Sequence, residues 1–229
     1  MKMAFIQFIC FQLLLVCTAA PFRNLDLQSP DIKTLSNVSP GGAEVNKIIP
    51  GWQLQIASLD VPTMLYNNIC LSCAGAQLYG PDNPMRGDKF NLLMVSGSGE
   101  SEHLPVSIFQ TGDVPGFARS LQFTGRLFPS ADFLSVSLGG QQLLLNQFEM
   151  VGDSYYYGLD VSAWAGRAAE LRFTVMATTS LNGAGAILSD IHFSAMELPA
   201  IPEPSTWALL ATGLSALAWN HRRRGIRRA

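Results

Sequence analysis

The stretch Asp160–Val175, DVSAWAGRAAELRFTV, joins a short turn to a clearly alternating strand. Every second position from Leu171 to Val175 is apolar, and Arg172 and Thr174 lie between them. A period of two residues is typical of a β-strand with one face buried and the other solvated. This segment therefore predicts a sheet that packs against a core.

The turn before this strand has the residues that begin and end a helical turn. An aspartate at the first position accepts a backbone N–H, and a glycine can end the turn. We therefore expect Asp160 to cap a turn that carries Trp164 and ends at Gly166. We also expect Trp164 to cover Leu171 and Phe173 at the end of the fold, a structural role rather than a platform for a sugar ring.

Similar short segments recur along the chain, separated by Gly, Pro, Asn and Asp. Strands are expected near residues 52–59, 76–79, 90–96, 104–110, 119–125, 133–138, 142–146, 155–157, 171–177 and 186–194. Gly139-Gly140 predicts a two-residue hairpin, because both positions of that turn need a positive φ. The fold class predicted is all-β, a single β-sandwich of the jelly-roll type with one short helical turn.

The N-terminus has the features of a secretory signal peptide. Lys2 precedes the uncharged apolar stretch Met3–Val16, and small residues follow it. The stretch is shorter than the ~20 residues of a membrane span. We expect cleavage after Ala19, which makes residues 1–19 the signal peptide and residues 20–200 the β-sandwich domain.

The C-terminal segment 201–229, IPEPSTWALLATGLSALAWNHRRRGIRRA, has three parts. They are the Pro-Glu-Pro triplet Pro202, Glu203 and Pro204, the apolar run 207–219, and the arginines Arg222, Arg223, Arg224, Arg227 and Arg228. Cationic residues after an apolar run stay on the cytoplasmic side, so the arginines predict a stop-transfer signal behind a transmembrane helix. The alternative is a buried helix of the domain.

This order of parts resembles the PEP-CTERM sorting signal of Gram-negative bacteria. The resemblance implies that an exosortase-type membrane enzyme recognises Pro202, Glu203 and Pro204 and processes the tail. The chain would then cross the inner membrane transiently before it reaches the cell surface or the extracellular matrix. Proline on both sides of Glu203 keeps the backbone extended, which suits entry into an enzyme cleft.

Blocks of the body are similar to those of many PEP-CTERM proteins: IPGWQL, VPGFARSLQF, YYGLDVSAWAGRAAELRFTV and ILSDIHFSAMELP. Such bodies resemble galactose-binding-like and carbohydrate-binding jelly rolls, which implies extracellular polysaccharide as a partner. In some related modules a pair of aspartates helps to hold calcium. Here Ser189 stands in place of the first aspartate, next to Asp190, which puts that site in doubt.

Charge and cysteines bear on partners and compartment. Residues 20–200 carry nine Lys and Arg against sixteen Asp and Glu, a net charge of −7, which argues against nucleic acid. Cys70 and Cys73 are too few for a structural zinc site, so a local disulfide or a pair of buried thiols is expected. Cys17 raises lipidation as an alternative, but Val16 stands where a lipoprotein signal has a small residue.

Other chemistry-bearing residues do not form a recognisable frame. Arg86-Gly87-Asp88 is a polar turn before a strand, and His103 lies in a Gly, Ser and Glu-rich segment. Asp190 and His192 are expected to share a face of the last strand, at i and i+2, and that face is expected to be solvated. We therefore assign no catalytic residue, no cofactor and no metal.

Aromatic residues give the best indication of binding. Tyr155, Tyr156 and Tyr157 are consecutive, so a strand there exposes at least one ring. A sugar stacks on such a ring while nearby polar groups bond its hydroxyls. The groups placed to do so are Asn146, Gln147 and Asp153. The candidate glycan contacts are thus the three tyrosines and Asp153, and the alternative is one core and one edge tyrosine.

Two functions from different classes are compatible with these features. The first is a non-catalytic protein of an exopolysaccharide layer that binds glycan or is purely structural. The second is a secreted polysaccharide-acting hydrolase on the same scaffold. The lack of a recognisable triad frame or metal-ligand string in the sequence favours the first.

Overall fold

The computed structural model describes residues 19–31, 42–68, 73–81, 89–97, 103–178, 183–198, 212 and 214–215. Contacts divide the chain into two units, Met1–Glu197 and Leu198–Ala229. The first unit is a β-sandwich, which confirms the predicted fold class. In the second unit, the described residues 212, 214 and 215 are helical.

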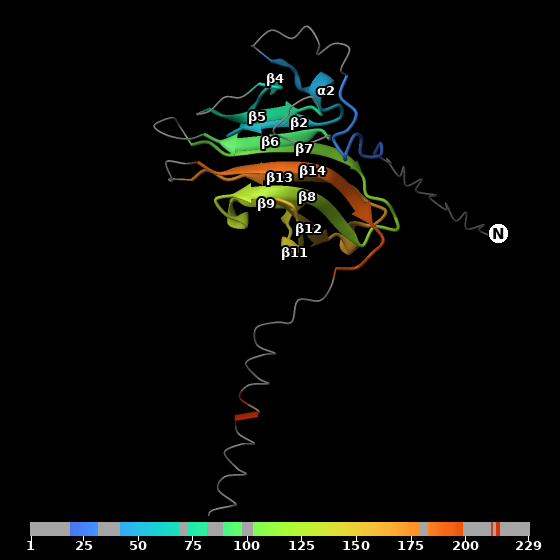
Figure 1. The fold of residues 1–229 in the computed structure, drawn as a ribbon. Coiled ribbons are helices and arrows are strands. Elements are labelled where there is room, and N and C mark those ends of the chain that lie inside the picture. The colour runs from blue at the N-terminus through green and yellow to red at the C-terminus, as the bar shows by residue number, and fades with distance from the viewer. Residues whose placement is uncertain are drawn as a thin grey trace, which may run out of the picture. The chain divides into compact units, whose positions relative to one another are not determined.

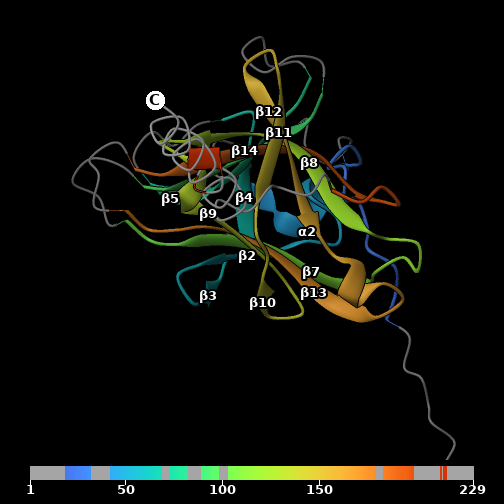
Figure 2. The same ribbon diagram turned by 90° about the horizontal axis from the view of Figure 1, so that it is seen from below.

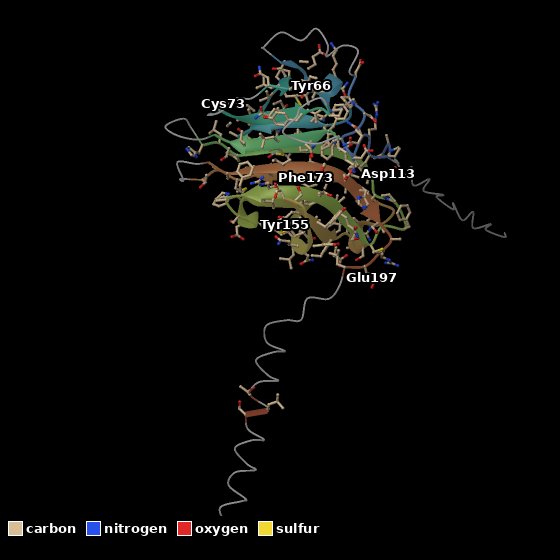
Figure 3. All side chains as sticks on the ribbon, in the orientation of Figure 1. Tyr66, Cys73, Asp113, Tyr155, Phe173 and Glu197 are labelled. Carbon is tan, nitrogen blue, oxygen red and sulfur yellow. The ribbon has the colours of Figure 1, made fainter. Side chains whose placement is uncertain are left out.

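One layer of the sandwich is an eight-stranded sheet (Figure 1). In spatial order its strands are β1 (Ala43–Glu44), β4 (Thr63–Tyr66), β5 (Ala74–Tyr79), β6 (Asn91–Ser96), β14 (Gly185–Ser194), β8 (Ser120–Phe128), β12 (Ser154–Asp160) and β11 (Asn146–Val151). Its neighbours pair antiparallel, apart from the parallel pair β4 and β5. Tyr66 on β4 and Tyr155 on β12 lie far apart along this sheet (Figure 3).

The other layer is a six-stranded antiparallel sheet, seen below the first in Figure 2. Its order is β10 (Gln141–Gln142), β9 (Leu134–Leu138), β13 (Ala168–Val175), β7 (Val106–Asp113), β2 (Gln53–Ile56) and β3 (Leu59–Asp60). Three short helical elements connect strands: α2 (Val45–Ile48), η1 (Ala131–Phe133) and η2 (Ser162–Trp164).

The strand order is that of a jelly roll. From β6 onward the chain passes between the sheets from β6 to β7, β7 to β8, β8 to β9, β10 to β11, β12 to β13 and β13 to β14. The last two long strands then insert between earlier ones: β13 between β7 and β9, and β14 between β6 and β8. This interleaving of two Greek keys ties the C-terminal strands of the domain into the middle of each sheet.

The core lies between the sheets and is rich in aromatic rings. Phe123 stacks on Tyr157 at 5.2 Å between ring centroids and meets Phe173 edge-on at 5.5 Å. Trp52 contacts Phe173 from the other side at 6.2 Å. Phe173 is fully buried in the middle of the sandwich (Figure 3). Burying rings of this size supplies much of the hydrophobic stabilisation of such a domain.

Most of the predicted strands are present, and the exception has a physical reason. The expected strand 142–146 is wrong, because the chain leaves one sheet at Gln142 and joins the other at Asn146. Leu143 is buried in between, and its N–H bonds the Val136 carbonyl. An apolar run that crosses between two sheets has the same sequence pattern as a short strand. The short strands β1 and β4 were not predicted, nor was the longer β11.

The hairpin and the helical turn are as predicted. Gly139 and Gly140 have φ of 59° and 79°, and they join paired strands β9 and β10. The Ser162 N–H donates to Asp160 Oδ1 at 2.9 Å, so Asp160 accepts a backbone N–H of the turn as predicted, although the N-cap position itself is Val161. Trp164 is half-buried against the core. Its indole nitrogen lies so close to Gly139 that a Cβ there would be 2.8 Å away.

Strand β14 contains a bulge at Asp190, which has a positive φ of 54°. Ser189 pairs with Thr124 and His192 with Gln122, so one extra residue is inserted. The insertion lets Leu188 and Ile191 both be fully buried, although they are three residues apart. Asp190 and His192 are therefore not related as i and i+2 of a regular strand, contrary to the prediction.

The segment after the expected cleavage site is part of the fold. The Ala20 carbonyl accepts the Asp113 N–H at 3.0 Å, and Phe22 contacts Phe193 on β14 at 5.4 Å. A Cβ at Gly112 would lie 2.8 Å from Phe22, so only glycine admits this ring. Ala20, the residue that follows the predicted cleavage, is thus bonded to the sandwich.

Candidate functional site

The tail motif lies mainly outside the described residues. Pro202, Glu203, Pro204 and the arginines Arg222, Arg223, Arg224, Arg227 and Arg228 are among the residues not described. Thr212, Leu214 and Ser215 are helical, inside the run 207–219 that was expected to be a helix. Within the described part of the chain, there is no helix of the length and hydropathy that a membrane span requires.

Of the two cysteines that follow the predicted signal peptide, Cys70 and Cys73, the structure describes one. Cys73 is disulfide-bonded. Cys70 lies outside the described residues, so the pairing of Cys70 with Cys73 stays a prediction. The signal peptide 1–19 also stays a prediction, since the description begins at residue 19, and Arg86-Gly87-Asp88 is not described either.

The three consecutive tyrosines take three different positions on β12. Tyr157 is 2% exposed and stacks on Phe123, so it belongs to the core. Burial raises the pKa of its phenol, and the nearby Tyr155 raises it further. Tyr155 is half-buried and packs on the same side, whereas Tyr156 is 36% exposed on the opposite face. Of the candidate glycan contacts, Tyr156 and Asp153 are the exposed ones.

Strand register shows which side chains lie beside Tyr156. Tyr156 pairs with Thr124 on β8, which pairs with Ser189 on β14. On the other side, Tyr156 pairs with Glu149 on β11. Neighbouring strands are about 4.8 Å apart, so these four side chains form one row across the outer face of the eight-stranded sheet.

A second row lies two residues further along the same strands. Asn146 pairs with Gly158, Gly158 with Gln122, and Gln122 with His192. Gly158 has no side chain, so the surface of this row is recessed between the amide side chains of Asn146 and Gln122. We call these two rows, together, the tyrosine face: Glu149, Tyr156, Thr124, Ser189, Asn146, Gly158, Gln122 and His192.

Two polar atoms of the tyrosine face are not used by the fold. Asn146 Oδ1 and Thr124 Oγ1 are buried and have no hydrogen-bond partner among the described residues. Buried polar atoms in native proteins are nearly always bonded. Each of these atoms therefore calls for a partner from outside the described residues. An exposed phenol beside amides and hydroxyls is the arrangement that binds a sugar ring.

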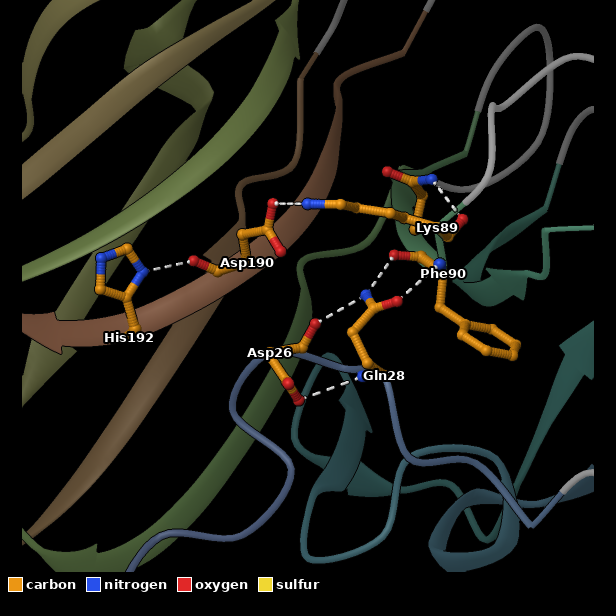
Figure 4. Close-up of polar contacts among 7 residues, drawn as sticks. Asp26, Gln28, Lys89, Phe90, Asp190 and His192 are labelled. Carbon is orange, nitrogen blue, oxygen red and sulfur yellow. Dashed lines mark hydrogen bonds and ion pairs between the residues drawn. The ribbon is translucent and has the colours of Figure 1, made fainter.

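One edge of this face carries an ion pair, shown in Figure 4. Lys89 Nζ lies 2.8 Å from Asp190 Oδ2, so the carboxylate at the bulge is neutralised. The His192 ring Nδ1 is 2.8 Å from the Asp190 carbonyl oxygen. Gln28 bonds both the N–H and the carbonyl of Phe90, which fixes the chain next to Lys89. The bulge sets the placement of Asp190 and His192.

The outer face of the six-stranded sheet is also polar, but its groups bond one another. Arg172 donates to Glu170 at 2.9 Å and to Gln55 at 2.7 Å, and its guanidinium lies 4.0 Å above the Phe109 ring. Ser107 and Thr174 share a hydrogen bond of 2.8 Å between their hydroxyls.

A groove of about 480 Å³ lies beside α2 and the start of β2, and Trp52 is among its lining residues. Three of its polar side chains have partners within the fold. Glu44 pairs with Lys47, Asp60 accepts from Gln55, and Asn46 accepts the Gly51 N–H. Among the described residues, no group of three or more His, Cys, Asp or Glu could hold a metal ion.

Sequence reasoning found Tyr156, Asn146 and Asp153 but missed Thr124, Gln122 and Ser189. These come from strands far apart in the chain, which only the register brings together. One indication was present in β8, where Ser120, Gln122, Thr124 and Arg126 alternate with core residues. Gln147, also proposed to bond sugar hydroxyls, pairs with Tyr157 instead and is exposed at the sheet edge.

Comparison with known proteins identifies the tail. The family model for the PEP-CTERM protein-sorting motif matches residues 200–224, which confirms the motif predicted from the sequence. No curated protein matches the chain. Among solved structures, the enzymatically active domain of tailspike protein 4 of bacteriophage CBA120 is similar over 69% of this chain and 21% of that chain, at 13% identity and a TM-score of 0.35. So distant a likeness says nothing about what this chain binds.

Proposed function

We propose that this chain is a surface protein sorted by an exosortase-type enzyme, and that it binds extracellular polysaccharide without catalysis at the tyrosine face. The observation that carries the proposal is the PEP-CTERM motif at residues 200–224. The motif supports export and processing by a membrane-bound enzyme, and we propose that this takes place in a Gram-negative bacterium. After processing, the body would remain at the cell surface or in the extracellular matrix.

The composition of the tail supports this route. The apolar run 207–219 precedes five arginines, which hold the C-terminus on the cytoplasmic side while the body is outside. The run has only about 20 Å of length as a helix, less than the ~30 Å of a bilayer core. A short span of this kind suits a temporary anchor that an enzyme removes.

The chemistry of the tyrosine face supports binding rather than hydrolysis. Its groups are a phenol, two amides, two hydroxyls, an imidazole and the single carboxylate of Glu149, which can form hydrogen bonds and a stacking surface for sugars. Glycoside hydrolysis usually employs two carboxylates on either side of the scissile bond. The carboxylates here, Glu149 and Asp153, are both exposed on the β11–β12 hairpin. The second candidate function, a polysaccharide hydrolase, would need such a pair.

Mass spectrometry of the surface-associated protein tests the sorting step. The expected C-terminus lies near residues 202–205, and replacement of Glu203 by Ala should leave the tail in place. Recovery of intact chains ending at Ala229 from the mature wild-type pool would contradict the proposal. A strain without the processing enzyme serves as the control for cleavage by unrelated proteases.

A pull-down on a panel of polysaccharides tests the binding step. Tyr156→Ala should weaken binding about tenfold, since a stacked aromatic contributes roughly 1–1.5 kcal/mol. Phe117→Ala is the matched control, because Phe117 is 61% exposed but lies in a loop outside the face. Equal losses in both variants would exclude the tyrosine face as the site. Release of reducing ends during the incubation would favour the hydrolase instead.

A further inference from the structure

The tyrosine face is bordered by one arginine whose charge the described fold does not neutralise. Arg126 lies on β8, two residues beyond Thr124, and is exposed on the same outer face. The ion pairs within the described residues join Lys47 to Glu44, Lys89 to Asp190 and Arg172 to Glu170. Arg126 has no ion-pair partner in that part of the chain.

Register places Arg126 within reach of a ligand on Tyr156. Tyr156 is directly opposite Thr124, so Arg126 is its diagonal neighbour. Diagonal Cα atoms on adjacent strands are about 7–8 Å apart, and an arginine side chain can bridge that distance. A chain of sugars stacked on Tyr156 and extending over β8 would therefore pass the guanidinium.

The position of Arg126 follows from the register of β8 and β12. Tyr155 pairs with Gly125, so Arg126 lies at the level of Ser154, where β12 begins. The Asp153 carboxylate is exposed at the hairpin tip nearby and forms no ion pair within the described residues. The Asp190 carboxylate on β14 is already paired with Lys89. Arg126 is therefore a cationic group that a negatively charged ligand on this face can reach over β8.

We propose that the polysaccharide bound at this face carries carboxylate groups, as a polymer of uronic acids does, and that Arg126 binds them. The proposal rests on the proposed function, whose site it specifies further. A guanidinium binds a carboxylate through two parallel hydrogen bonds, which a neutral sugar cannot accept in the same way. The body has a net charge of −7, so general attraction does not bring an acidic polymer to it. Recognition has to come from a local contact.

Polygalacturonate and its methyl ester test the proposal, because they share a backbone and differ in carboxylate charge. Binding of the mature full-length protein to each would be measured by calorimetry or affinity electrophoresis. We expect binding to the acid form at least about tenfold tighter, as for one charge-assisted contact. Arg126→Gln should abolish this preference and Arg126→Lys should retain part of it. Arg119→Gln is the control, since Arg119 is another exposed arginine and its loss changes the net charge equally.

The outcomes separate the two proposals. One outcome is that both polymers bind equally, that Arg126→Gln has no effect, and that Tyr156→Ala still weakens binding. In that case the carboxylate preference is wrong, but the tyrosine face remains the binding site. If Arg119→Gln lowers binding to the acid form as much as Arg126→Gln, the effect is one of net charge and the proposal also fails. If no polysaccharide binds the wild-type protein, both the preference and the proposed function are wrong.

Discussion

The two outer faces of the sandwich both carry polar side chains, and the eight-stranded sheet also carries an apolar cluster around Leu93 and Ile187. The two faces use their polar groups differently. On the six-stranded sheet, Arg172 is bonded on two sides and stacked on Phe109, and Ser107 is bonded to Thr174. On the eight-stranded sheet, Thr124 and Asn146 each keep a buried polar atom without a partner among the described residues. The first face completes its own hydrogen bonds, and the second does not.

This difference teaches where to look for a ligand on a sheet. Polar side chains on an outer face are expected of any antiparallel sheet with one solvated side. They become informative only when the fold fails to pair them, since an unpaired buried group costs about 1–3 kcal/mol. The unpaired atoms of Thr124 and Asn146 are the reason why we propose the tyrosine face, and not the opposite face, as the binding surface.

Trp164→Ala should produce the largest loss of stability, and it should leave the contrast between the two outer faces unchanged. Trp164 packs on the core that both sheets share, so its removal should cost ~3 kcal/mol, the lower end for core Trp→Ala, because the ring is only half-buried. Urea denaturation measures the cost, and polysaccharide binding at low temperature should be retained. A stable variant that no longer binds would move the site to Trp164.

Arg172→Ala should have the next largest effect, on stability alone. It breaks bonds to Glu170 and Gln55 and uncovers Phe109, for a loss of about 1–2 kcal/mol. Arg126→Ala, the matched change on the other face, should alter stability by less than about 0.5 kcal/mol. Thermal unfolding of both variants tests the comparison, and equal losses would show that Arg126 is structural as well.

The fold could be predicted from the sequence because local patterns carry it. Alternation marked the long strands, Gly139-Gly140 marked a hairpin and Asp160 marked a capped turn, and the structure has each of them. The strand expected at 142–146 failed because Leu143 is buried by a crossing between sheets, which has no local pattern of its own.

The candidate site could be predicted only in part. The run of tyrosines showed that a ring would be exposed, but only register shows that it is Tyr156 rather than Tyr155 or Tyr157. Thr124 and Ser189 are 65 positions apart in the sequence and become neighbours when β14 inserts beside β8. Whether a hydroxyl is left unbonded depends on such tertiary neighbours, so composition cannot indicate it.

A pair of Thr→Val substitutions sharpens the comparison further. Thr174→Val removes the hydrogen bond to Ser107, which is 5% exposed, and should cost ~1 kcal/mol. Thr124→Val removes a hydroxyl that has no partner among the described residues, so stability should be unchanged or slightly higher. Binding should fall severalfold in Thr124→Val only. If both variants lose the same stability, Thr124 is bonded within the fold and the contrast between the faces disappears.

The smallest effect should come from Asp160, at the end of the strand that carries Tyr156. Hydrogen bonds from the Ser162 side chain and then from its backbone N–H hold the pKa of this carboxyl below its ordinary value, and Arg119 adds to this while partial burial opposes it. A folded-state pKa below the unfolded value of about 3.9 means that the stabilisation is complete above that pH and is lost as the pH falls through the folded pKa. The contribution should be small, because the group is exposed and screened by solvent.

Melting temperatures from pH 5 to pH 2.5 should therefore fall slightly less steeply for Asp160→Asn than for the parent, with polysaccharide binding at neutral pH unchanged in both. If the melting temperatures of the two proteins fall equally steeply with pH, the hydrogen bond to Asp160 contributes no pH-dependent stability. A loss of binding in Asp160→Asn would show that this turn, rather than the sheet face alone, positions Tyr156.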